Sequence, residues 1–541
     1  NSAFNGCTSL SSIELPSEIT EIGSNVFRKC SNLNSVILPD GITEIGSSAF
    51  SNCTNLRNIE LPEGLVRIGE GAFYLSGLES IKIPDGVTTI EKTTFQTCKN
   101  LKSITLPSRL TKIGMYAFRE CYQLNSVEIP DTVTTIEKEA FNECRELSSV
   151  KLPSRITTIQ DQVFQGCSKL ESISIPEGVT SIGYSAFKLC TGLKSAYIPN
   201  GVTEILGSAF WGCEGLESVT LSENLTYVGN RAFYNLPNAK FTNFSTKIQS
   251  IGTEAFYNCG SLPSKIELLE MTSIGEGAFY KGHGVEEVLL PDTLTEIPKN
   301  LFRECVDLKK IKLPNNLTKI GEGAFSGCTS LLSAPVPDSV TEIGLGAYSS
   351  CKSLTSISIP DSVTVVGRGL FSGCTNLTTV KLPNGMTTLG SSFFSGCTSL
   401  ETVDLPNSIT EIGESAFKGS GLKTIQIPEQ VTKLGDRAFY GCSQLETVTI
   451  PNTVSVTGSE LFSSCTKLTR VTLPAGMTTL GSYFFSGCTS LETIDLPNSI
   501  TEIGESTFEG SGLKTIQIPE KVTKLGKRAF YDCSNLETVT V

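Results

Sequence analysis

Apolar and polar residues follow a pattern of about 23 residues that repeats along the whole chain of 541 residues. In one copy, Ile104 and Leu106 alternate with the polar residues Ser103 and Thr105. Alternation with a period of two is typical of a strand that buries one of its faces. The repeat therefore predicts a short strand in every copy, with one face in the core and the other toward solvent.

Residues that end strands and turn the chain recur at fixed places in the same pattern. A proline such as Pro107 directly follows the strand, and because it has no N–H it stops strand pairing there. A second apolar run follows, as in residues 133–136, before an Ile-Gly pair such as Ile182 and Gly183, where glycine permits a sharp turn. The next segment, A-F-x-x-C, has a spacing that suits a single helical or 3₁₀ turn.

A phenylalanine marks one position in each copy, from Phe4 to Phe530. The position occurs 24 times, with Tyr348 as the one replacement, and all intervals are 23 residues except three of 22. A fixed period between 20 and 50 residues indicates a solenoid, in which each repeat, or rung, buries its apolar face against its neighbours.

The unit L-x-x-I-x-L-P-x-x-V-T-x-I-G-x-x-A-F-x-x-C-x-x, seen in residues 170–192, resembles the BspA-like class of leucine-rich repeat, and the resemblance covers the full chain. It implies a β-rich, right-handed, curved solenoid with a parallel sheet on the concave side and short strands and 3₁₀ or helical turns on the other sides. Related proteins occur on the surfaces of bacteria and parasitic protists, where they act in adhesion and host contact. The resemblance thus implies a location at the cell surface or outside the cell.

We expect a single solenoid domain over residues 1–541, because a solenoid grows by adding rungs. Both ends of the sequence lie inside repeats, which suggests a fragment of a longer protein without its caps and targeting segments. No run of 18 or more apolar residues predicts a membrane span.

Near-duplicated blocks of four rungs occupy residues 360–450 and 451–541. Within them, residues 393–450 and 484–541 agree at 50 of 58 positions, with an offset of 91 residues. Differences such as Lys418 against Glu509 reverse charge at positions that we expect to be exposed, whereas core positions barely change. Such expansion suits a spacer or a multivalent surface better than a catalytic pocket.

The net charge of −12 argues against nucleic acid as a partner, since nucleic-acid binding needs clustered Lys and Arg. The charged residues are scattered singly along the repeats, without blocks of one sign.

All 19 cysteines stand three residues after the phenylalanine position. Zinc needs four ligands that converge on one point, whereas this pattern supplies one sulfur per rung in a line. Neighbouring side chains would project in parallel at about the rung spacing, too far apart for good disulfide geometry, and an odd number leaves one cysteine over. We therefore predict a column of buried free thiols.

Residues for catalysis are scarce. His283 is the only histidine, and the recurring positions contain no Ser-His-Asp or Cys-His arrangement and no phosphate-binding glycine loop. We interpret His283 as a loop residue in a rung without cysteine, and we expect no enzymatic activity, cofactor or metal.

The rungs of residues 211–290 depart from the pattern, because several of them lose the proline or the cysteine. Ile266 and Leu268 stand one residue late, which predicts a strand bulge. The residue after the phenylalanine, polar in most rungs, is aromatic four times in succession here, and these residues form a candidate aromatic strip: Trp211, Tyr234, Tyr257 and Tyr280. The strip is either a partner-binding site or side packing that stabilises irregular rungs.

The outward face of the predicted strands carries mostly Ser and Thr, with Tyr197 as the residue on it that best resembles a binding anchor. Hydroxyl groups there would hydrogen-bond a protein or a glycan, or only satisfy packing between strands. The sequence predicts a non-enzymatic scaffold that binds a protein or glycan, of the surface or secreted adhesion type. Two alternatives remain open: a stalk or filament component selected for its length, and an intracellular scaffold for protein interactions.

Overall fold

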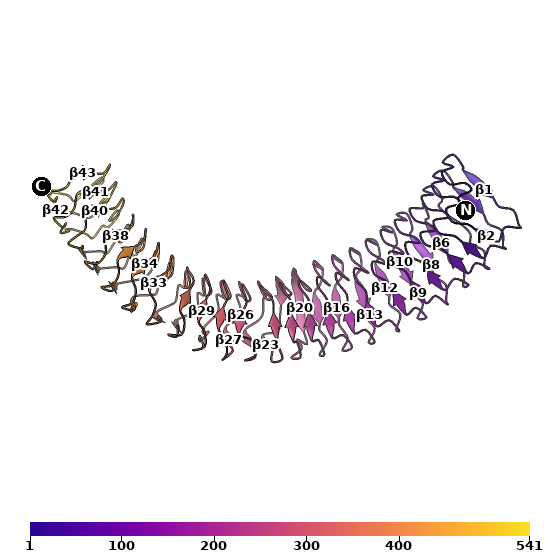
Figure 1. Ribbon diagram of the computed structural model, residues 1–541, viewed down its shortest axis with the longest axis horizontal. Helices are drawn as coiled ribbons and strands as arrows, with labels where there is room; N and C mark the ends of the chain where they lie inside the picture. Colours follow the sequence, from indigo (N-terminus) through magenta and orange to yellow (C-terminus); the bar gives the residue numbers. More distant parts are fainter. The chain divides into compact units, whose positions relative to one another are not determined.

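The computed structural model describes residues 1–541 and consists of strands, turns and loops, without a helix. All paired strands are parallel, and in regular rungs each residue pairs with the equivalent position one rung later, as Val127 of β10 (Ser126–Glu128) pairs with Val150 of β12 (Ser149–Lys151). The rungs stack one on the next (Figure 1). The predicted repeat solenoid with parallel strands is confirmed.

Each regular rung contributes its first strand to one row, and we call the outward side of this row the strand face. Its strands alternate exposed and buried residues, as Ser103, Ile104 and Thr105 of β8 do. The first row comprises β1 (Ser12–Glu14), β3 (Ser35–Ile37), β6 (Ser80–Lys82), β8 (Ser103–Thr105), β10, β12, β14 (Ser172–Ser174), β16 (Ser195–Tyr197), β18 (Ser218–Thr220), β20 (Leu236–Thr242), β22 (Cys259–Ser261), β23 (Lys265–Glu267), β25 (Glu287–Leu289), β27 (Lys310–Lys312), β30 (Ser356–Ser358), β32 (Thr379–Lys381), β35 (Thr424–Gln426), β37 (Thr447–Thr449), β39 (Arg470–Thr472), β42 (Thr515–Gln517) and β44 (Thr538–Thr540).

A second row consists of two-residue strands, which follow the proline and in regular rungs end at the isoleucine of the Ile-Gly pair. They are β2 (Glu21–Ile22), β4 (Glu44–Ile45), β5 (Arg67–Ile68), β7 (Thr89–Ile90), β9 (Lys112–Ile113), β11 (Thr135–Ile136), β13 (Thr158–Ile159), β15 (Ser181–Ile182), β17 (Glu204–Ile205), β19 (Tyr227–Val228), β21 (Ser250–Ile251), β24 (Ser273–Ile274), β26 (Glu296–Ile297), β28 (Lys319–Ile320), β29 (Glu342–Ile343), β31 (Val365–Val366), β33 (Thr388–Leu389), β34 (Glu411–Ile412), β36 (Lys433–Leu434), β38 (Val456–Thr457), β40 (Thr479–Leu480), β41 (Glu502–Ile503) and β43 (Lys524–Leu525).

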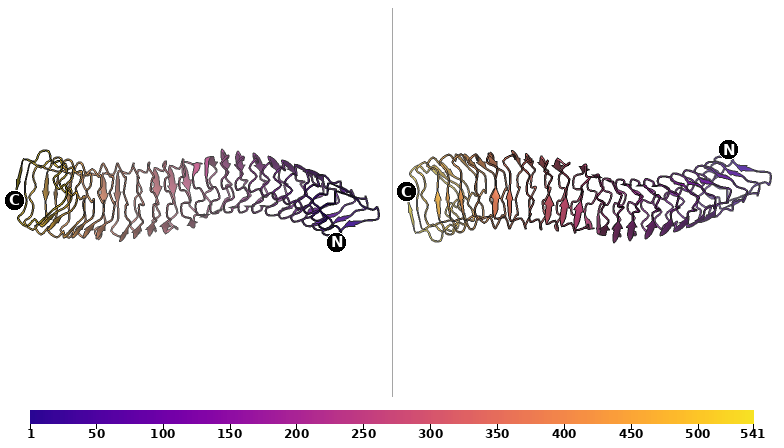
Figure 2. Two further views of the ribbon diagram at one scale, coloured as in Figure 1. Left: turned by 90° about the horizontal axis from the view of Figure 1, so that it is seen from above. Right: turned by 90° about the horizontal axis from the view of Figure 1, so that it is seen from below.

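The chain forms two compact units. Unit 1 comprises residues 1–263 and 268–284, and unit 2 comprises residues 264–267 and 285–541. Within each unit the same stacking of rungs is visible from two further directions (Figure 2). The single domain expected from the sequence stays a prediction.

The phenylalanine column forms the centre of the core. In unit 1, Phe164, Phe187 and Phe210 are fully buried, and their ring centroids lie 5.7 and 5.1 Å apart in successive stacked pairs. Leucine, isoleucine and valine side chains from both rows of strands surround the rings. Each rung therefore removes most of its apolar surface from water only by contact with the rungs beside it.

The A-F-x-x-C segment is not the helical or 3₁₀ turn that its spacing suggested. In the rung of Phe27, the flanking residues Asn25 and Lys29 have φ angles of +60° and +63°, which interrupt a right-handed helix. The N–H groups of these three residues instead donate to carbonyl oxygens of the next rung, at 2.8–2.9 Å. The segment is a series of turns that is hydrogen-bonded from rung to rung.

The three 22-residue intervals correspond to rungs in which a Ser-Gly pair follows the phenylalanine segment. The N–H of Gly512 donates to the carbonyl oxygen of Cys488 at 3.0 Å, and a Cβ atom on Gly512 would lie 2.1 Å from the carbonyl oxygen of Thr489. Gly77 and Gly421 repeat this arrangement. In each case the rung before has no first-row strand, so residues 58–60, 402–404 and 493–495 interrupt the row.

The predicted irregularity in residues 211–290 takes the form of a shift in strand register. Leu236 and Lys240 of β20 pair with Cys259 and Ser261 of β22. The two paired positions are therefore four residues apart in β20 but only two residues apart in β22. The late position of Ile266 is accommodated by a break, because β22 ends at Ser261 and β23 begins only at Lys265.

Candidate functional site

The aromatic strip is a continuous column of four rings in unit 1. The ring centroids of Trp211 and Tyr234 lie 5.8 Å apart, those of Tyr234 and Tyr257 lie 4.5 Å apart, and those of Tyr257 and Tyr280 lie 5.0 Å apart. All four side chains are half-buried. The repeat brings them together because each occupies the same position one rung after the other.

The orientation of the rings divides the strip into a centre and two ends. Tyr234 and Tyr257 are stacked with an angle of 10° between their planes, so each covers one face of the other. Trp211 and Tyr280 stand at 82° and 88° to their neighbours. Burial raises the pKa of the Tyr234 phenol, and the nearby Tyr257 and Glu254 raise it further. The central hydroxyl of the strip thus stays protonated at neutral pH.

Cationic side chains lie over the rings of the strip. The Lys188 Nζ atom is 3.9 Å from the centroid of the Trp211 ring, and the Arg231 guanidinium is 5.7 Å from that of Tyr234. Arg231 also forms an ion pair with Glu254 at 2.7 Å. Cation–π contacts of this kind fix the ring positions and leave the strip with a positive border.

Tyr197 does not belong to the strip. It lies on β16 of the strand face, where it pairs with Thr220 of β18, and 53% of its surface is exposed. None of the ring contacts involves it. The five residues selected from the sequence therefore form one cluster of four and one separate residue.

Hollows in the strand face were not expected from the sequence. One, of about 590 Å³, lies where residues 58–60 interrupt the first row, and Glu60 and Lys82 are among its lining residues. Another, of about 410 Å³, lies at the interruption of residues 402–404, with Asp404 and Gln426 in its lining. The signal that could have located both is the 22-residue interval, which places a shortened rung directly after each interruption.

The cysteines are free thiols, and 17 of the 19 are buried, the exceptions being Cys7 and Cys533. Buried Sγ atoms donate to the carbonyl oxygen of the phenylalanine position in the previous rung, as Cys121 does to Phe95 at 3.1 Å and Cys374 does to Tyr348 at 3.0 Å. Burial raises the pKa of Cys442 to about 11 and that of Cys488 to about 12. The predicted column of buried thiols is confirmed, and protonated thiols of this kind are poor nucleophiles.

His283 lies in a loop, and its backbone forms hydrogen bonds to the rung before it. Its N–H donates to the carbonyl oxygen of Cys259 at 3.0 Å, and its own carbonyl accepts from the N–H of Leu262 at 2.8 Å. The interpretation of His283 as a loop residue is confirmed by these contacts. No group of three or more His, Cys, Asp or Glu side chains is placed to hold a metal ion.

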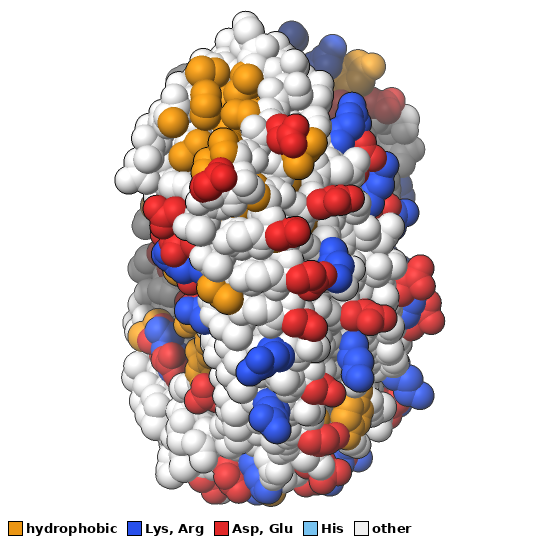
Figure 3. All heavy atoms as spheres, turned by 90° about the vertical axis from the view of Figure 1, so that its right-hand side faces the viewer, with side chains coloured by type: hydrophobic (Ala, Val, Ile, Leu, Met, Phe, Trp, Pro, Cys, Tyr) orange, Lys and Arg blue, Asp and Glu red, His pale blue; other side chains and the backbone are white.

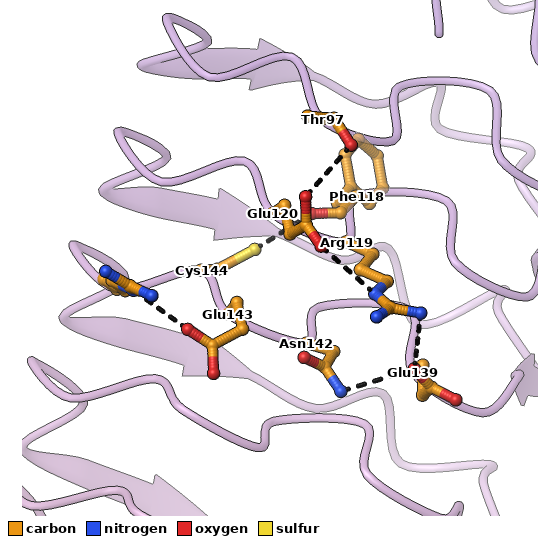
Figure 4. Close-up of polar contacts among 9 residues, drawn as sticks. Thr97, Phe118, Arg119, Glu120, Glu139, Asn142, Glu143 and Cys144 are labelled. Carbon is orange, nitrogen blue, oxygen red and sulfur yellow. Dashed lines mark hydrogen bonds and ion pairs between the residues drawn. The ribbon is translucent and has the colours of Figure 1, made fainter. Parts of the chain in front are cut away.

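Charged side chains mainly connect neighbouring rungs. In the network of Figure 4, Arg119 contacts Glu139 at 3.1 Å, and Glu120 accepts a hydrogen bond from Thr97 at 3.2 Å. Acidic and basic side chains are interspersed on the face of the molecule in Figure 3. These are exposed or half-exposed pairs that hold rungs in register and contribute little each to stability.

The structure has no helix of the length and apolarity that a membrane crossing requires.

Comparison with known proteins identifies the family of the repeat. The family described as "BspA type Leucine rich repeat region (6 copies)" matches residues 1–102, 88–217, 180–309, 295–423 and 410–537. No curated protein matches the chain.

Solved structures of leucine-rich repeat proteins are similar to this chain. One from Bacteroides ovatus is 25% identical, with 80% of this chain and 88% of that chain covered and a TM-score of 0.35. A leucine rich cell surface protein from Faecalibacterium prausnitzii is 25% identical, with 86% and 87% covered and a TM-score of 0.25.

Proposed function

Because this chain belongs to the BspA-type leucine-rich repeat family, we propose that it is a non-enzymatic scaffold, exposed at a cell surface or secreted, that binds a partner protein through the aromatic strip. The observation that carries the proposal is the continuous column of four half-buried rings on consecutive rungs, Trp211 to Tyr280. The occurrence of related repeat proteins on bacterial and protist surfaces supports the proposed location.

The ends of the strip are suited to act as anchors. Tryptophan and tyrosine dominate the energetics of protein interfaces because they bury a large apolar area and keep a polar group for hydrogen bonding. Tyr234 and Tyr257 cover one face of each other, whereas Trp211 and Tyr280 stand edge-on to their neighbours in the strip. Lys188 and Lys281 lie over the Trp211 and Tyr280 rings, so a partner would meet each end ring together with a lysine. Lys188 borders the Trp211 end and favours a partner with acidic groups near its apolar contact.

A second candidate function, a stalk selected for its length, is favoured by the near-duplication of residues 393–450 and 484–541. The duplication adds rungs without adding a new kind of surface. Under this alternative the aromatic strip only stabilises irregular rungs.

The double variant Trp211→Ser/Tyr257→Ser separates the two functions. A screen of the natural chain against an array of purified proteins identifies a binder. The affinity for this binder and the melting temperature are then measured for the natural chain and for the double variant. We expect the variant to bind about 2 kcal/mol more weakly, with its melting temperature nearly unchanged. The matched control is Tyr74→Ser/Tyr440→Ser, which removes single tyrosines at the same position of other rungs and should leave the affinity unchanged.

Intact affinity together with a lower melting temperature would assign the strip to stability alone. Failure of the scaffold to bind any arrayed protein, together with filaments in electron micrographs, would support the stalk.

A further inference from the structure

The strand face of unit 2 is interrupted at residues 333–337, with the sequence S-A-P-V-P. Pro335 occupies the position equivalent to Lys312 of β27, one rung earlier, and it has no N–H to donate. Pairing with β27 is reduced to a single bridge between Lys310 and Ser333, and the next strand, β30, pairs only with β32. This interruption has a different origin from the three that precede shortened rungs, because the rung has its full length.

A hollow of about 650 Å³ opens at this interruption. Small outward residues create it, since Pro335 and Ser358 stand where the rungs on either side carry Lys312 and Lys381. Side-chain hydroxyls line it, from Ser333, Ser356, Ser358, Ser362 and Thr379. Its volume lies within the range of small-molecule sites, which is about 300–1,000 Å³.

Three exposed lysines stand on the rungs before and after the hollow. Lys381 lines it, and Lys310 and Lys312 occupy the positions one rung before Ser333 and Pro335. None of the three forms an ion pair, although the neighbouring Lys309 pairs with Glu286 at 2.9 Å. Of the other lysines on first-row strands, Lys82 and Lys265 form ion pairs, with Glu63 and Glu267, whereas Lys151 and Lys240 do not. A cluster of unpaired lysines creates a positive potential that attracts anionic groups.

Two carboxylates, Asp338 and Asp361, also line the hollow, at equivalent positions of successive rungs. Asp361 accepts hydrogen bonds from the backbone N–H and the side-chain amide of Asn384, at 2.8 and 3.1 Å. Both aspartates are exposed, and a carboxylate oxygen can accept further hydrogen bonds from hydroxyl groups. The lining thus offers one lysine, Lys381, and several hydrogen-bond acceptors, and two more lysines stand on the rung before it.

We propose that this hollow is a binding site for an acidic saccharide, one that carries sulfate or carboxylate groups among its hydroxyls. The lysines would take the anionic groups, and the serine, threonine and aspartate oxygens would hydrogen-bond the hydroxyls. A uniformly acidic peptide fits less well, because it would place carboxylates against Asp338 and Asp361 and find no aromatic or aliphatic pocket for an anchor. The site is independent of the aromatic strip, which lies in unit 1.

Binding to the full chain tests the proposal with three probes: a sulfated oligosaccharide, the same oligosaccharide without its charged groups, and a poly-glutamate peptide. The test variant is Lys312→Glu/Lys381→Glu. Its matched control is Lys151→Glu/Lys240→Glu, which reverses two strand-face lysines of unit 1 that also have no ion-pair partner. Because all four side chains are exposed, neither variant should alter the fold, and thermal unfolding verifies this.

We expect the sulfated oligosaccharide to bind the test variant at least about tenfold more weakly than the natural chain, and binding to weaken as salt is added. The control variant should bind it within about twofold of the natural chain, because its lysines lie far from the hollow in sequence and in unit 1. A third variant, Ser358→Trp, fills the hollow without changing the charge and should also weaken binding.

Four results would each overturn the proposal. Two concern the sulfated oligosaccharide: it fails to bind the natural chain, or both double variants weaken its binding equally. The other two concern the remaining probes: the uncharged oligosaccharide binds as tightly as the sulfated one, or poly-glutamate binds more tightly than the sulfated oligosaccharide and loses affinity in the test variant. The last result would assign the hollow to an acidic peptide instead.

Discussion

The Sγ atom of Cys144 donates a hydrogen bond to the carbonyl oxygen of Phe118, 3.2 Å away in the previous rung (Figure 4). The same carbonyl accepts the N–H of Cys121 from its own rung at 3.1 Å. Cysteine combines a small apolar side chain with a weak donor, so it fills the core and satisfies the second lone pair of this buried oxygen. This dual role explains why all 19 cysteines occupy one position.

Thiol reactivity should distinguish the folded from the unfolded chain. A thiol reagent at neutral pH should modify Cys7, which is exposed, and Cys533 more slowly, while the 17 buried cysteines stay protected. After denaturation the count should approach 19. Rapid modification of most thiols in the folded protein would contradict the buried column, and so would intrachain disulfides found by mass spectrometry.

Alkaline pH should destabilise the protein through the same thiols. Burial raises the folded-state pKa of Cys442 to about 11 and of Cys98 to about 12, above the ordinary value of 9.0. Above pH 9 the unfolded chain therefore loses thiol protons that the folded chain keeps, and the free energy of unfolding falls until the folded-state pKa is reached. Each thiol contributes a slope of about 1.4 kcal/mol per pH unit in this window.

Comparison with the double variant Cys98→Ala/Cys442→Ala isolates the effect from other groups that titrate there. Chemical denaturation between pH 8 and 11, in the presence of a reductant, should show a shallower loss of stability for the variant. Equal slopes for the two proteins would mean that these thiols do not control the alkaline limit.

Replacing Tyr348 by Phe should stabilise the chain. Tyr348 is the one tyrosine in the phenylalanine column, and its fully buried hydroxyl has no hydrogen-bond partner. Its ring is stacked on Phe325 at 5.3 Å, so phenylalanine fits the same place without the unsatisfied group. We expect the free energy of unfolding to rise by about 1–2 kcal/mol in denaturant titrations. The reverse change in the neighbouring rung, Phe325→Tyr, should lower the free energy of unfolding by a similar amount. A decrease for Tyr348→Phe together with an increase for Phe325→Tyr would refute the explanation.

Glycine at the shortened rungs should be irreplaceable. In Gly512→Ala the new Cβ atom would lie 2.1 Å from the carbonyl oxygen of Thr489, so the backbone of one rung must move. We expect a loss of about 2 kcal/mol or more in thermal or chemical unfolding. The control is Gly476→Ala, where a Cβ atom meets nothing within 4 Å, and which should change stability by less than about 1 kcal/mol. A similar loss of stability in Gly512→Ala and Gly476→Ala would show that the close contact between rungs at Gly512 does not require glycine.

The sequence predicted the features that depend on position within the repeat. Phenylalanine and cysteine each return at one place, so their burial and stacking follow from the repeat alone, as does the contact between Tyr234 and Tyr257. The turn at Phe27 was predicted wrongly because Asn25 and Lys29 adopt positive φ angles, which glycine signals but these residues do not.

The strand-face hollow at Pro335 was missed for a different reason. Pro335 breaks pairing with a residue 23 positions away, and the hollow exists only because Ser358 of the following rung is also small. Pro335 is the one proline at its position in the repeat and predicts the break in pairing, whereas Ser358 is ordinary by itself. Such a feature arises from the combination of side chains on successive rungs, so it becomes visible only when the rungs are placed next to one another.

The near-identical blocks of residues 393–450 and 484–541 have a consequence for inheritance. Genes that encode tandem copies are prone to unequal recombination, and an exchange between these two copies would remove or insert 91 residues. The junction would fall between equivalent positions, so every remaining rung would still find the phenylalanine, cysteine and glycine contacts that it needs on both sides. The length of the array can therefore vary between descendants of one gene while each product stays foldable.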